Sequence, residues 1–220
     1  MSEVVSFASA RGTPPAVKRS ETKLEKLDAR RLELAEATLE TLAELGYART
    51  SLREIANNSQ FSHGVLHYYF HDKVDLICCA VRYYKATCAT RYDQVVATAR
   101  TPEDLIEGFS QKLRETLTNE ARMHRLWYDL RSQALFEDSM RKDVQAIDKN
   151  LEDMIWRVAS RYAELTRTTL AISPGILYAL FDGLFQRALL GFVSGDAGAI
   201  DKLIVDVGKM LPRVLEPRAA

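Results

Sequence analysis

Apolar side chains recur at helical spacing along most of this 220-residue chain, and this periodicity restricts the possible folds more than any other feature. From Lys23 onward the apolar positions follow three- and four-residue steps, interrupted at glycine, proline and capping residues. Alternating runs of β-branched residues with Asn-Gly turns are nearly absent. The pattern predicts an all-α protein. Helices are expected over about 23–45, 51–58, 62–69, 72–99, 102–117, 121–137, 138–167, 174–193 and 197–215.

The composition narrows the class of protein. Hydrophobic residues make up 47% of the chain and charged residues 27%, which is enough to bury a core. Lys+Arg and Asp+Glu both number 30, so a nucleic-acid surface would have to arise from local placement of charge. Cys78, Cys79 and Cys88 lack C-x-x-C spacing and predict reduced, buried thiols. With no signal peptide or membrane span evident, we expect a cytoplasmic protein without a membrane partner.

Residues 1–22 differ from the rest of the chain. They contain Pro14-Pro15 and the basic residues Arg11, Lys18 and Arg19. This composition predicts a flexible arm. A solvated tail is the preferred interpretation, and a basic arm that touches DNA is the alternative.

Two short helices joined by a tight turn form the most specific local pattern. Ser51 can cap the first helix, with Glu54 completing a capping box, and Ser62 can cap the second. In a helix-turn-helix the first helix braces the second, whose outward side chains enter the DNA major groove. The inward positions are Leu52, Ile55, Ala56, Phe61, Val65 and Leu66, and the outward ones are His63, Gly64, His67 and Tyr68. We therefore predict a three-helix DNA-binding domain over residues 23–71.

Three histidines four residues apart raise a second interpretation of the same stretch. His63, His67 and His71 would share one helix face, as metal-ligating histidines do. However, His71 follows Tyr69-Phe70, where the helix should end, and Asp72 is better placed as a helix cap. The sequence therefore favours DNA-facing or solvated imidazoles, and predicts neither a metal site nor a cofactor.

Residues 50–56, Thr-Ser-Leu-Arg-Glu-Ile-Ala, and 61–73, Phe-Ser-His-Gly-Val-Leu-His-Tyr-Tyr-Phe-His-Asp-Lys, resemble the DNA-binding domain of the tetracycline-repressor (TetR) family. The close similarity covers about residues 25–80, and the remainder is similar only in architecture. The resemblance implies a homodimeric transcription factor, usually a repressor, which a small molecule releases from a near-palindromic operator. Carried over by position, the implied DNA contacts are Ser51, Arg53, Ser62, His63, Gly64, His67, Tyr68, Tyr69 and Lys73.

Three positions depart from the family pattern. The turn has Ser59-Gln60 where Ala-Gly is usual, so the turn is expected to differ or to be strained. His63 stands where lysine or arginine is common, and His67 replaces the usual tyrosine. Because free histidine titrates near pH 6.5, we hypothesise that DNA affinity depends on pH.

The resemblance places a ligand pocket and the dimer contacts in residues 72–220. Candidate ligand-binding residues are Tyr84, Cys88, Phe109, Met123, Trp127, Arg131 and Phe181, for most of which core packing is the alternative. Arg131, four residues after Trp127, could hold an anionic ligand group or pair with Asp129 or Glu137. The last two helices are apolar on more than one face, which favours a two-fold dimer. The interface candidates are Leu177, Leu180, Leu184, Phe185, Leu189, Leu203, Ile204, Val207 and Leu211.

Two other functions are compatible with a helical chain of this length. An enzyme would need a catalytic pattern, but the sequence has no Gly-rich phosphate loop, G-x-S-x-G or H-E-x-x-H motif, so we predict that the chain is not an enzyme. A helical protein-interaction bundle would explain the apolar C-terminal helices but not the helix-turn-helix. An activator with the same DNA-binding domain remains an alternative to a repressor. The operator and the effector are not specified by the sequence.

Overall fold

A computed structural model describes residues 23–217, so the expected N-terminal arm, residues 1–22, lies outside the described part of the chain. The helices are α1 (Lys23–Arg49), α2 (Leu52–Asn57), α3 (His63–Tyr69), α4 (Lys73–Ala89), α5 (Asp93–Thr98), α6 (Pro102–Gln133), α7 (Asp138–Thr166), α8 (Pro174–Val193) and α9 (Ala199–Arg213). Two short strands, β1 (Thr168–Leu170) and β2 (Leu215–Pro217), pair antiparallel. The predicted helical fold is confirmed.

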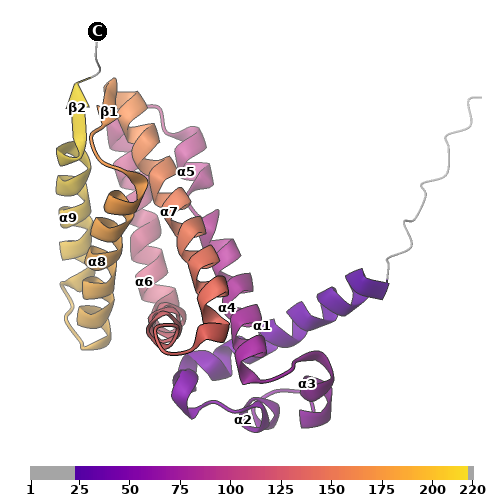
Figure 1. Ribbon diagram of the computed structural model, residues 1–220. Helices are drawn as coiled ribbons and strands as arrows, with labels where there is room; N and C mark the ends of the chain where they lie inside the picture. Colours follow the sequence, from indigo (N-terminus) through magenta and orange to yellow (C-terminus); the bar gives the residue numbers. More distant parts are fainter. Residues whose placement is uncertain (1–22, 218–220) are drawn as a thin grey trace, which may run out of the picture.

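The N-terminal helices α1, α2 and α3 form one end of the molecule (Figure 1). The side chains of Leu34, Leu42, Ile55, Leu66 and Phe70 bury almost completely where these helices meet each other and α4. Burial of these apolar side chains is the main stabilising contribution to this end. The short helices α2 and α3 depend on it, because helices of one or two turns are unstable alone.

Capping residues set the starts of several helices as the sequence indicated. The side chains of Ser51, Ser62 and Asp72 accept hydrogen bonds from the first turns of α2, α3 and α4. Thr101 and Asp104 form a reciprocal capping box on α6. The α1 helix loses helical geometry at Gly46, which adopts φ 73°, a conformation that favours glycine.

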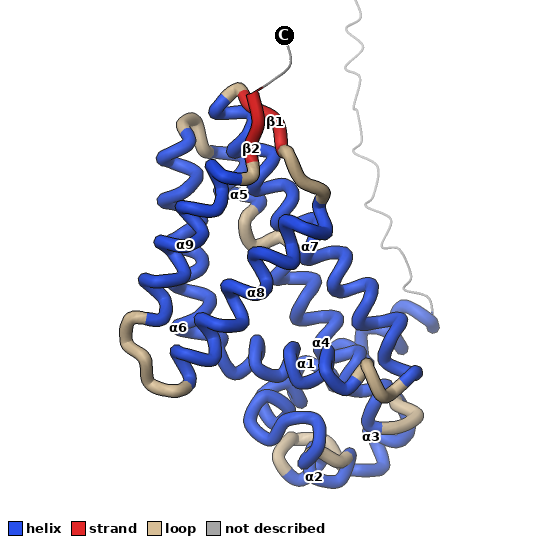
Figure 2. The backbone as a smooth tube through the Cα atoms, turned by 60° about the vertical axis from the view of Figure 1, so that its left-hand side comes forward, coloured by secondary structure: helices blue, strands red, loops and turns tan. Residues whose placement is uncertain are grey.

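The C-terminal helices α4 to α9 form an elongated bundle above the N-terminal end. In Figure 2, α2 and α3 lie at one extremity of the molecule and the β1–β2 pair at the other, with α6, α7, α8 and α9 running between them. Helix α4 joins the two ends, because its first turn follows α3 and its later turns pack on α7. A ligand in the bundle would therefore lie next to the helix that continues from α3.

The prediction of one helix over residues 72–99 was wrong. The chain turns at Thr90–Tyr92 and resumes as α5. Arg91 donates to Thr116 and Glu120 of α6, while the Tyr92 ring packs 4.6 Å from the Phe109 ring, also on α6. Consecutive residues of a straight helix point about 100° apart, so the turn is what allows both side chains to reach α6.

Two further differences are smaller. Segments 102–117 and 121–137 are one helix, α6, interrupted only by a non-helical residue, Glu120. The strands were missed because each is three residues long, and β1 begins only after Arg167 ends α7 in the left-handed conformation with φ 58°. Pro212, expected to kink or end the last helix, lies one residue before the end of α9.

Candidate functional site

The outward face of α3 is exposed as the sequence predicted. Ser62, His63, Gly64 and His67 are exposed, and Tyr68 has 77% of its surface accessible. Tyr69 is half-buried, with its ring edge-on to Tyr68 at 4.9 Å. On α2 the neighbouring positions Ser51 and Arg53 are also exposed. Together these residues present hydroxyl, imidazole and guanidinium donors on one end of the molecule, as a DNA-reading surface requires.

His63 and His67 form a pair, and His71 is separate from it. The Nε2 atoms of His63 and His67 lie 3.1 Å apart, so one ring donates and the other accepts. Since α3 ends at Tyr69, His71 lies outside the helix and interacts with the exposed Asp72 at 3.2 Å. The predicted interruption of the three-histidine series is therefore confirmed.

The turn between α2 and α3 differs from the family pattern without backbone strain. Ser59 and Gln60 avoid positive φ, since Arg167 is the one non-glycine residue with positive φ in the described residues. The Ser59 hydroxyl instead accepts a hydrogen bond from the Phe61 amide at 3.3 Å.

Lys73 has a second role beside its expected phosphate contact. Its ammonium donates to the Tyr47 carbonyl at 3.2 Å and lies 4.1 Å from the centre of the Tyr47 ring. The side chain is half-buried, and an ammonium has three protons to donate. Lys73 therefore braces α4 against α1, and contact with a phosphate stays a prediction.

A narrow cavity lies among α4, α6, α7 and α8 in the middle of the bundle. Its free volume is about 40 Å³, enough for a few water molecules. Aromatic and aliphatic side chains make up most of its wall, and polar groups enter at a few points. The lining residues are Lys85, Cys88, Arg91, Tyr92, Thr116, His124, Trp127, Tyr128, Leu151, Met154, Tyr178, Phe181, Asp182 and Phe185.

A chain of hydrogen bonds connects the polar groups on one side of this cavity. Lys85 Nζ lies 3.3 Å from His124 Nδ1, and His124 Nε2 lies 3.4 Å from the Tyr84 hydroxyl. Tyr84 in turn donates to Glu120, which also accepts from Arg91 at 2.6 Å. Each donor in this series has an acceptor when Lys85 donates to Nδ1 of a neutral His124.

Burial sets the charge states of the residues in this hydrogen-bonded series. It lowers the pKa of Lys85 to about 8, and Lys85 has only 3% of its surface exposed. Burial, reinforced by the charges of Lys85 and Arg91, holds the pKa of His124 well below its usual value. Burial also raises the pKa of Tyr84, so this phenol stays protonated. At neutral pH the cavity therefore contains a cationic Lys85 beside a neutral imidazole.

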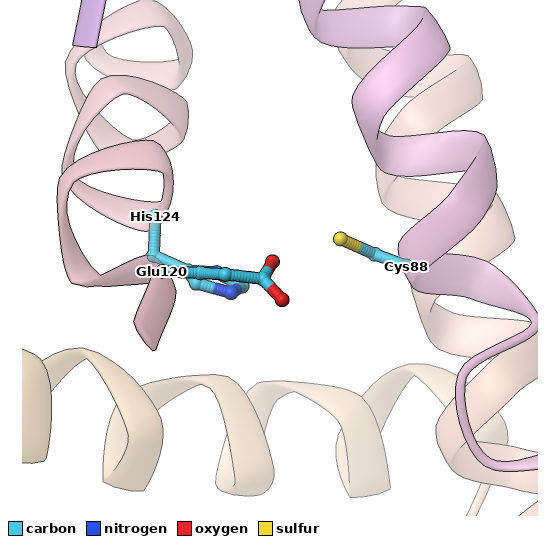
Figure 3. Close-up of side chains that lie close together, drawn as sticks. All are labelled: Cys88, Glu120 and His124. Carbon is cyan, nitrogen blue, oxygen red and sulfur yellow. The ribbon is translucent and has the colours of Figure 1, made fainter. Parts of the chain in front are cut away.

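Cys88, Glu120 and His124 bring three potential metal ligands together (Figure 3). Cys88 approaches from α4, while Glu120 and His124 come from α6, and their ligand atoms lie within 4.8 Å of one another. However, the Glu120 carboxylate is bonded to Arg91, and Lys85 contacts His124. Two cations at these distances would repel a divalent ion, so the donor set does not fit a metal.

The thiols match the expectation from the sequence. Cys78, Cys79 and Cys88 are free and buried. Burial raises the pKa of Cys78 to about 12 and also raises that of Cys79, which makes both poor nucleophiles at neutral pH.

The candidate ligand residues are distributed unevenly around the cavity. Cys88, Trp127 and Phe181 line it. Tyr84 joins through the hydrogen-bond chain, and Phe109 packs behind Phe181 with ring centres 5.8 Å apart. Met123 is half-buried and packs against the core without lining the cavity.

The expected pairing of Arg131 with Asp129 or Glu137 was wrong. Arg131 pairs with Asp182 of α8 and with Asp148 of α7 at 3.2 Å, and not with Asp129 or Glu137. Two carboxylates already neutralise this guanidinium, so it is a poor anion-binding group.

Sequence reasoning missed the charged residue that does line the cavity. Lys85 lies on a helical stripe with Ile77, Val81, Cys88 and Tyr92, all of which are buried. A lysine four residues after one buried position and three before another was the available signal. His124, Tyr128, Tyr178 and Asp182 could not be assigned in this way, because their meeting depends on how α6 and α8 pack.

The outer surface of α8 and α9 requires a correction to the predicted dimer contacts. Leu180 is 46% exposed, and Leu184 and Ile204 are partly buried. The other six candidates are buried within the protomer, because they face α6, α7 or each other, and so cannot form a surface: Leu177, Phe185, Leu189, Leu203, Val207 and Leu211. The exposed apolar side chains are instead Ile176, Leu180, Leu190, Val193 and Val205.

Helix α8 is also long and apolar enough to cross a membrane by length and composition, with 33% of its most apolar window buried. One face of α8 packs in the core, and the other is exposed. A groove between α8 and α9 continues the exposed face, with Leu184, Leu190 and Val205 among its lining residues.

Direct contacts join the bundle to the N-terminal helices. Arg125 of α6 donates to the Ala43 carbonyl at 3.1 Å, and Asp129 of α6 accepts from the Tyr47 amide at 2.7 Å. Arg31 of α1 donates to the Tyr69 carbonyl at the end of α3 and to Asp75 of α4. The position of α3 is therefore tied to both α4 and α6.

Comparison with known proteins is consistent with this geometry. Residues 34–77 match the family model described as bacterial regulatory proteins, tetR family. The chain is 28% identical to the HTH-type transcriptional regulator BetI of Burkholderia cenocepacia over 185 residues, covering 81% of this chain and 92% of the relative. It is also 28% identical to BetI of Burkholderia thailandensis over 204 residues, covering 90% and 99%.

Solved structures share the fold at lower identity. A TetR transcription regulator from Haloarcula marismortui superimposes with a TM-score of 0.68 at 18% identity, covering 86% of this chain and all of that one. The transcriptional regulator FadR from Bacillus subtilis, solved in complex with stearoyl-CoA, gives a TM-score of 0.63 at 15% identity and covers 86% and 99%.

Proposed function

The chain belongs to the TetR family of bacterial transcriptional regulators, and from this premise we propose that it is a homodimeric, cytoplasmic repressor that a small molecule releases from a palindromic operator. Residues 23–71 would bind DNA, and residues 72–220 would bind the effector and form the dimer. The observation that carries the proposal is an exposed reading helix joined by direct contacts to a bundle with an internal cavity.

The proposed DNA contacts follow from exposure and chemistry. His63, His67 and Tyr68 would reach base edges from α3, since their side chains are exposed on that helix. Ser51, Arg53, Ser62, Tyr69 and Lys73 would contact phosphates. An added Cβ on Gly64 would meet only the Ser62 hydroxyl, at 4.0 Å, so space within the protein does not require glycine here. Close approach of the DNA backbone would require it.

The proposed dimer uses the exposed face of α8 together with α9. Ile176, Leu180, Leu190 and Val205 leave an apolar surface that water solvates poorly. Packing this face against its copy would bury it in a four-helix arrangement. Two recognition helices would then lie about one DNA turn, roughly 34 Å, apart, as a palindromic operator requires.

Effector release would use the two contact routes between bundle and α3. A ligand that widens the cavity moves α4 and α6, since both line it. Movement of α6 alters the contacts of Arg125 and Asp129 with α1, and movement of α4 alters the bond from Arg31 to Asp75. Either change would shift the separation of the two α3 helices in a dimer.

The first experiment is binding of the purified protein to fragments upstream of its own gene, in rising salt and excess nonspecific DNA. We expect saturable binding to one palindromic fragment, with affinity falling steeply as salt rises. A His67→Ala, Tyr68→Ala double variant should lose the preference, whereas the matched control Tyr83→Ala on α4 should keep it. Absence of even nonspecific binding would contradict the proposal. Activation, instead of repression, of a reporter by the bound protein would support the activator alternative.

A further inference from the structure

We propose that the cavity among α4, α6, α7 and α8 binds a small organic monocarboxylate, with its anionic group on Lys85 and Trp127 and its apolar body against the aromatic wall. This inference rests on the proposed function and deepens it by naming the class of effector. Carboxylate binding can be measured without DNA, so the proposed ligand site and the proposed regulatory function can be tested separately.

Lys85 is the central observation. Its side chain is 97% removed from solvent, and its one hydrogen-bond partner in residues 23–217 is the neutral ring of His124. Its ammonium also lies 5.3 Å from the Trp127 ring and 5.5 Å from the Tyr84 ring, which are weak partners for a charge. A buried ammonium normally has a carboxylate partner, because desolvation is costly without one.

The carboxylates near Lys85 are already committed to other groups. Glu120 accepts from Arg91 and Tyr84. Asp182 accepts from Tyr128 and Arg131, and Asp148 accepts from Tyr178 and pairs with Arg131. Glu120 is therefore paired with Arg91, while Asp148 and Asp182 share Arg131. Lys85 has no carboxylate of the described residues at hydrogen-bond distance.

Trp127 supplies a second donor. It lines the same cavity, only 1% of its surface is exposed, and its indole Nε1–H has no acceptor among residues 23–217. A buried donor without an acceptor is uncommon in folded proteins. A carboxylate has two oxygens, which can accept from an ammonium and from a second donor together. One ligand group would thus satisfy both Lys85 and Trp127.

The rest of the wall determines the body of the ligand. Leu151, Met154, Phe181 and Phe185 contribute apolar surface, so a bare inorganic anion would leave most of the cavity without favourable contacts. A quaternary ammonium or other cation would be repelled by the ammonium of Lys85. The free volume of about 40 Å³ requires that the ligand be small or that the helices separate on binding.

Thermal unfolding with matched probes tests the proposal directly. We would compare hexanoate, benzoate and 3-phenylpropionate, each at about 10 mM, with the corresponding amides and with trimethylphenylammonium. At least one carboxylate should raise Tm progressively with concentration, whereas its amide and the ammonium probe should not. Equal shifts with the amide, a shift with the ammonium probe alone, or no shift with any carboxylate would each overturn the proposal.

Three variants locate the site. Lys85→Met keeps the length of the side chain and should weaken carboxylate binding more than tenfold. Trp127→Phe keeps a ring, removes the N–H, and should weaken it severalfold. The matched control Lys142→Met, on the exposed surface of α7, should bind like the parent protein. If Lys85→Met does not fold, two other measurements test the site. Trp127→Phe should bind the carboxylate more weakly than the parent protein, and the parent protein should bind it more weakly at about pH 9.5 than at about pH 7.

A parallel DNA measurement separates the site from the regulatory proposal. A carboxylate that raises Tm and also releases the operator supports both. A carboxylate that raises Tm through Lys85 but leaves operator binding unchanged supports the site and contradicts its role as the effector site.

Discussion

The recognition helix α3 and the internal cavity present polar side chains in opposite ways. On α3, Tyr68 is 77% exposed, and the His63–His67 contact is the one polar side-chain contact described between residues of that face. In the cavity, Lys85 is 3% exposed, and hydrogen bonds connect it through His124 to Tyr84. Substitutions on α3 should therefore change DNA affinity with little effect on stability. In the cavity, stability, charge state and binding should change together.

The largest expected effect comes from disrupting the proposed dimer, which would bring two α3 helices to one operator. Leu180→Asp places a charge on the exposed face of α8, where it would be buried in a dimer. We expect a monomer by sedimentation and a loss of operator affinity of about 100-fold or more, since a single recognition helix loses the advantage of joint binding. Carboxylate binding in the cavity should survive.

Phe136→Asp is the matched control, because Phe136 is a more exposed apolar residue in the turn between α6 and α7. The Phe136→Asp variant should have the same mass by sedimentation and the same operator affinity as the parent protein. If the Leu180→Asp variant remained a dimer, the interface would have to lie on another surface.

The next largest effect is on stability and concerns Lys85. Burial lowers its pKa from 10.5 to about 8, so between these values the unfolded chain binds more protons than the folded one. The stability contribution of Lys85 therefore rises as pH increases from about 7 to 10. Relative to Lys85→Met, the parent protein should gain roughly 2 kcal/mol over this range. Urea titrations of both proteins at each pH measure the difference in their free energies of unfolding. Taking the difference removes the contribution of the tyrosines, which both proteins contain. A difference that does not change with pH would contradict the lowered pKa of Lys85.

A smaller effect is expected on the DNA-facing surface. Tyr68→Ala should weaken operator binding by about 1–2 kcal/mol, roughly tenfold, because one exposed contact is lost. Its Tm should match that of the parent protein. A fall in Tm as large as that of a core variant such as Leu66→Ala would show that Tyr68 is part of the packing, which would remove the contrast with the cavity.

The smallest effect tests the histidine pair. Because free histidine titrates near pH 6.5, we expect operator affinity to rise about three- to tenfold as pH falls from about 8 to about 6. His63→Gln with His67→Gln should remove the dependence, and an unchanged affinity in the parent protein from pH 6 to 8 would contradict it.

The same contrast explains what the sequence could predict. The caps at Ser51, Ser62 and Asp72 and the break in α1 at Gly46 depend on a few neighbouring residues. For this reason α1, α2 and α3 were predicted nearly as observed. Local rules also predicted that His71 would lie outside α3, since Phe70 follows its last turn.

The cavity could be predicted only in part, because it depends on the packing of four helices. Cys88, Trp127 and Phe181 were identified as aromatic or sulfur-containing positions on core faces. Lys85 was missed because a charged residue is normally assigned to the surface. Arg131 was misassigned because its partners Asp148 and Asp182 come from other helices, and no spacing in the sequence brings them together.

The interruption of α6 at Glu120 gives the bundle the geometry of a lever. Beyond it, the helix continues for nine residues, about 13 Å, to Asp129. A tilt of about 3° at Glu120 would displace Asp129 by roughly 0.7 Å, enough to stretch its 2.7 Å bond to the Tyr47 amide beyond normal hydrogen-bond length. A displacement of a fraction of an ångström beside the cavity would thus become the loss of a whole contact at the far end of the arm.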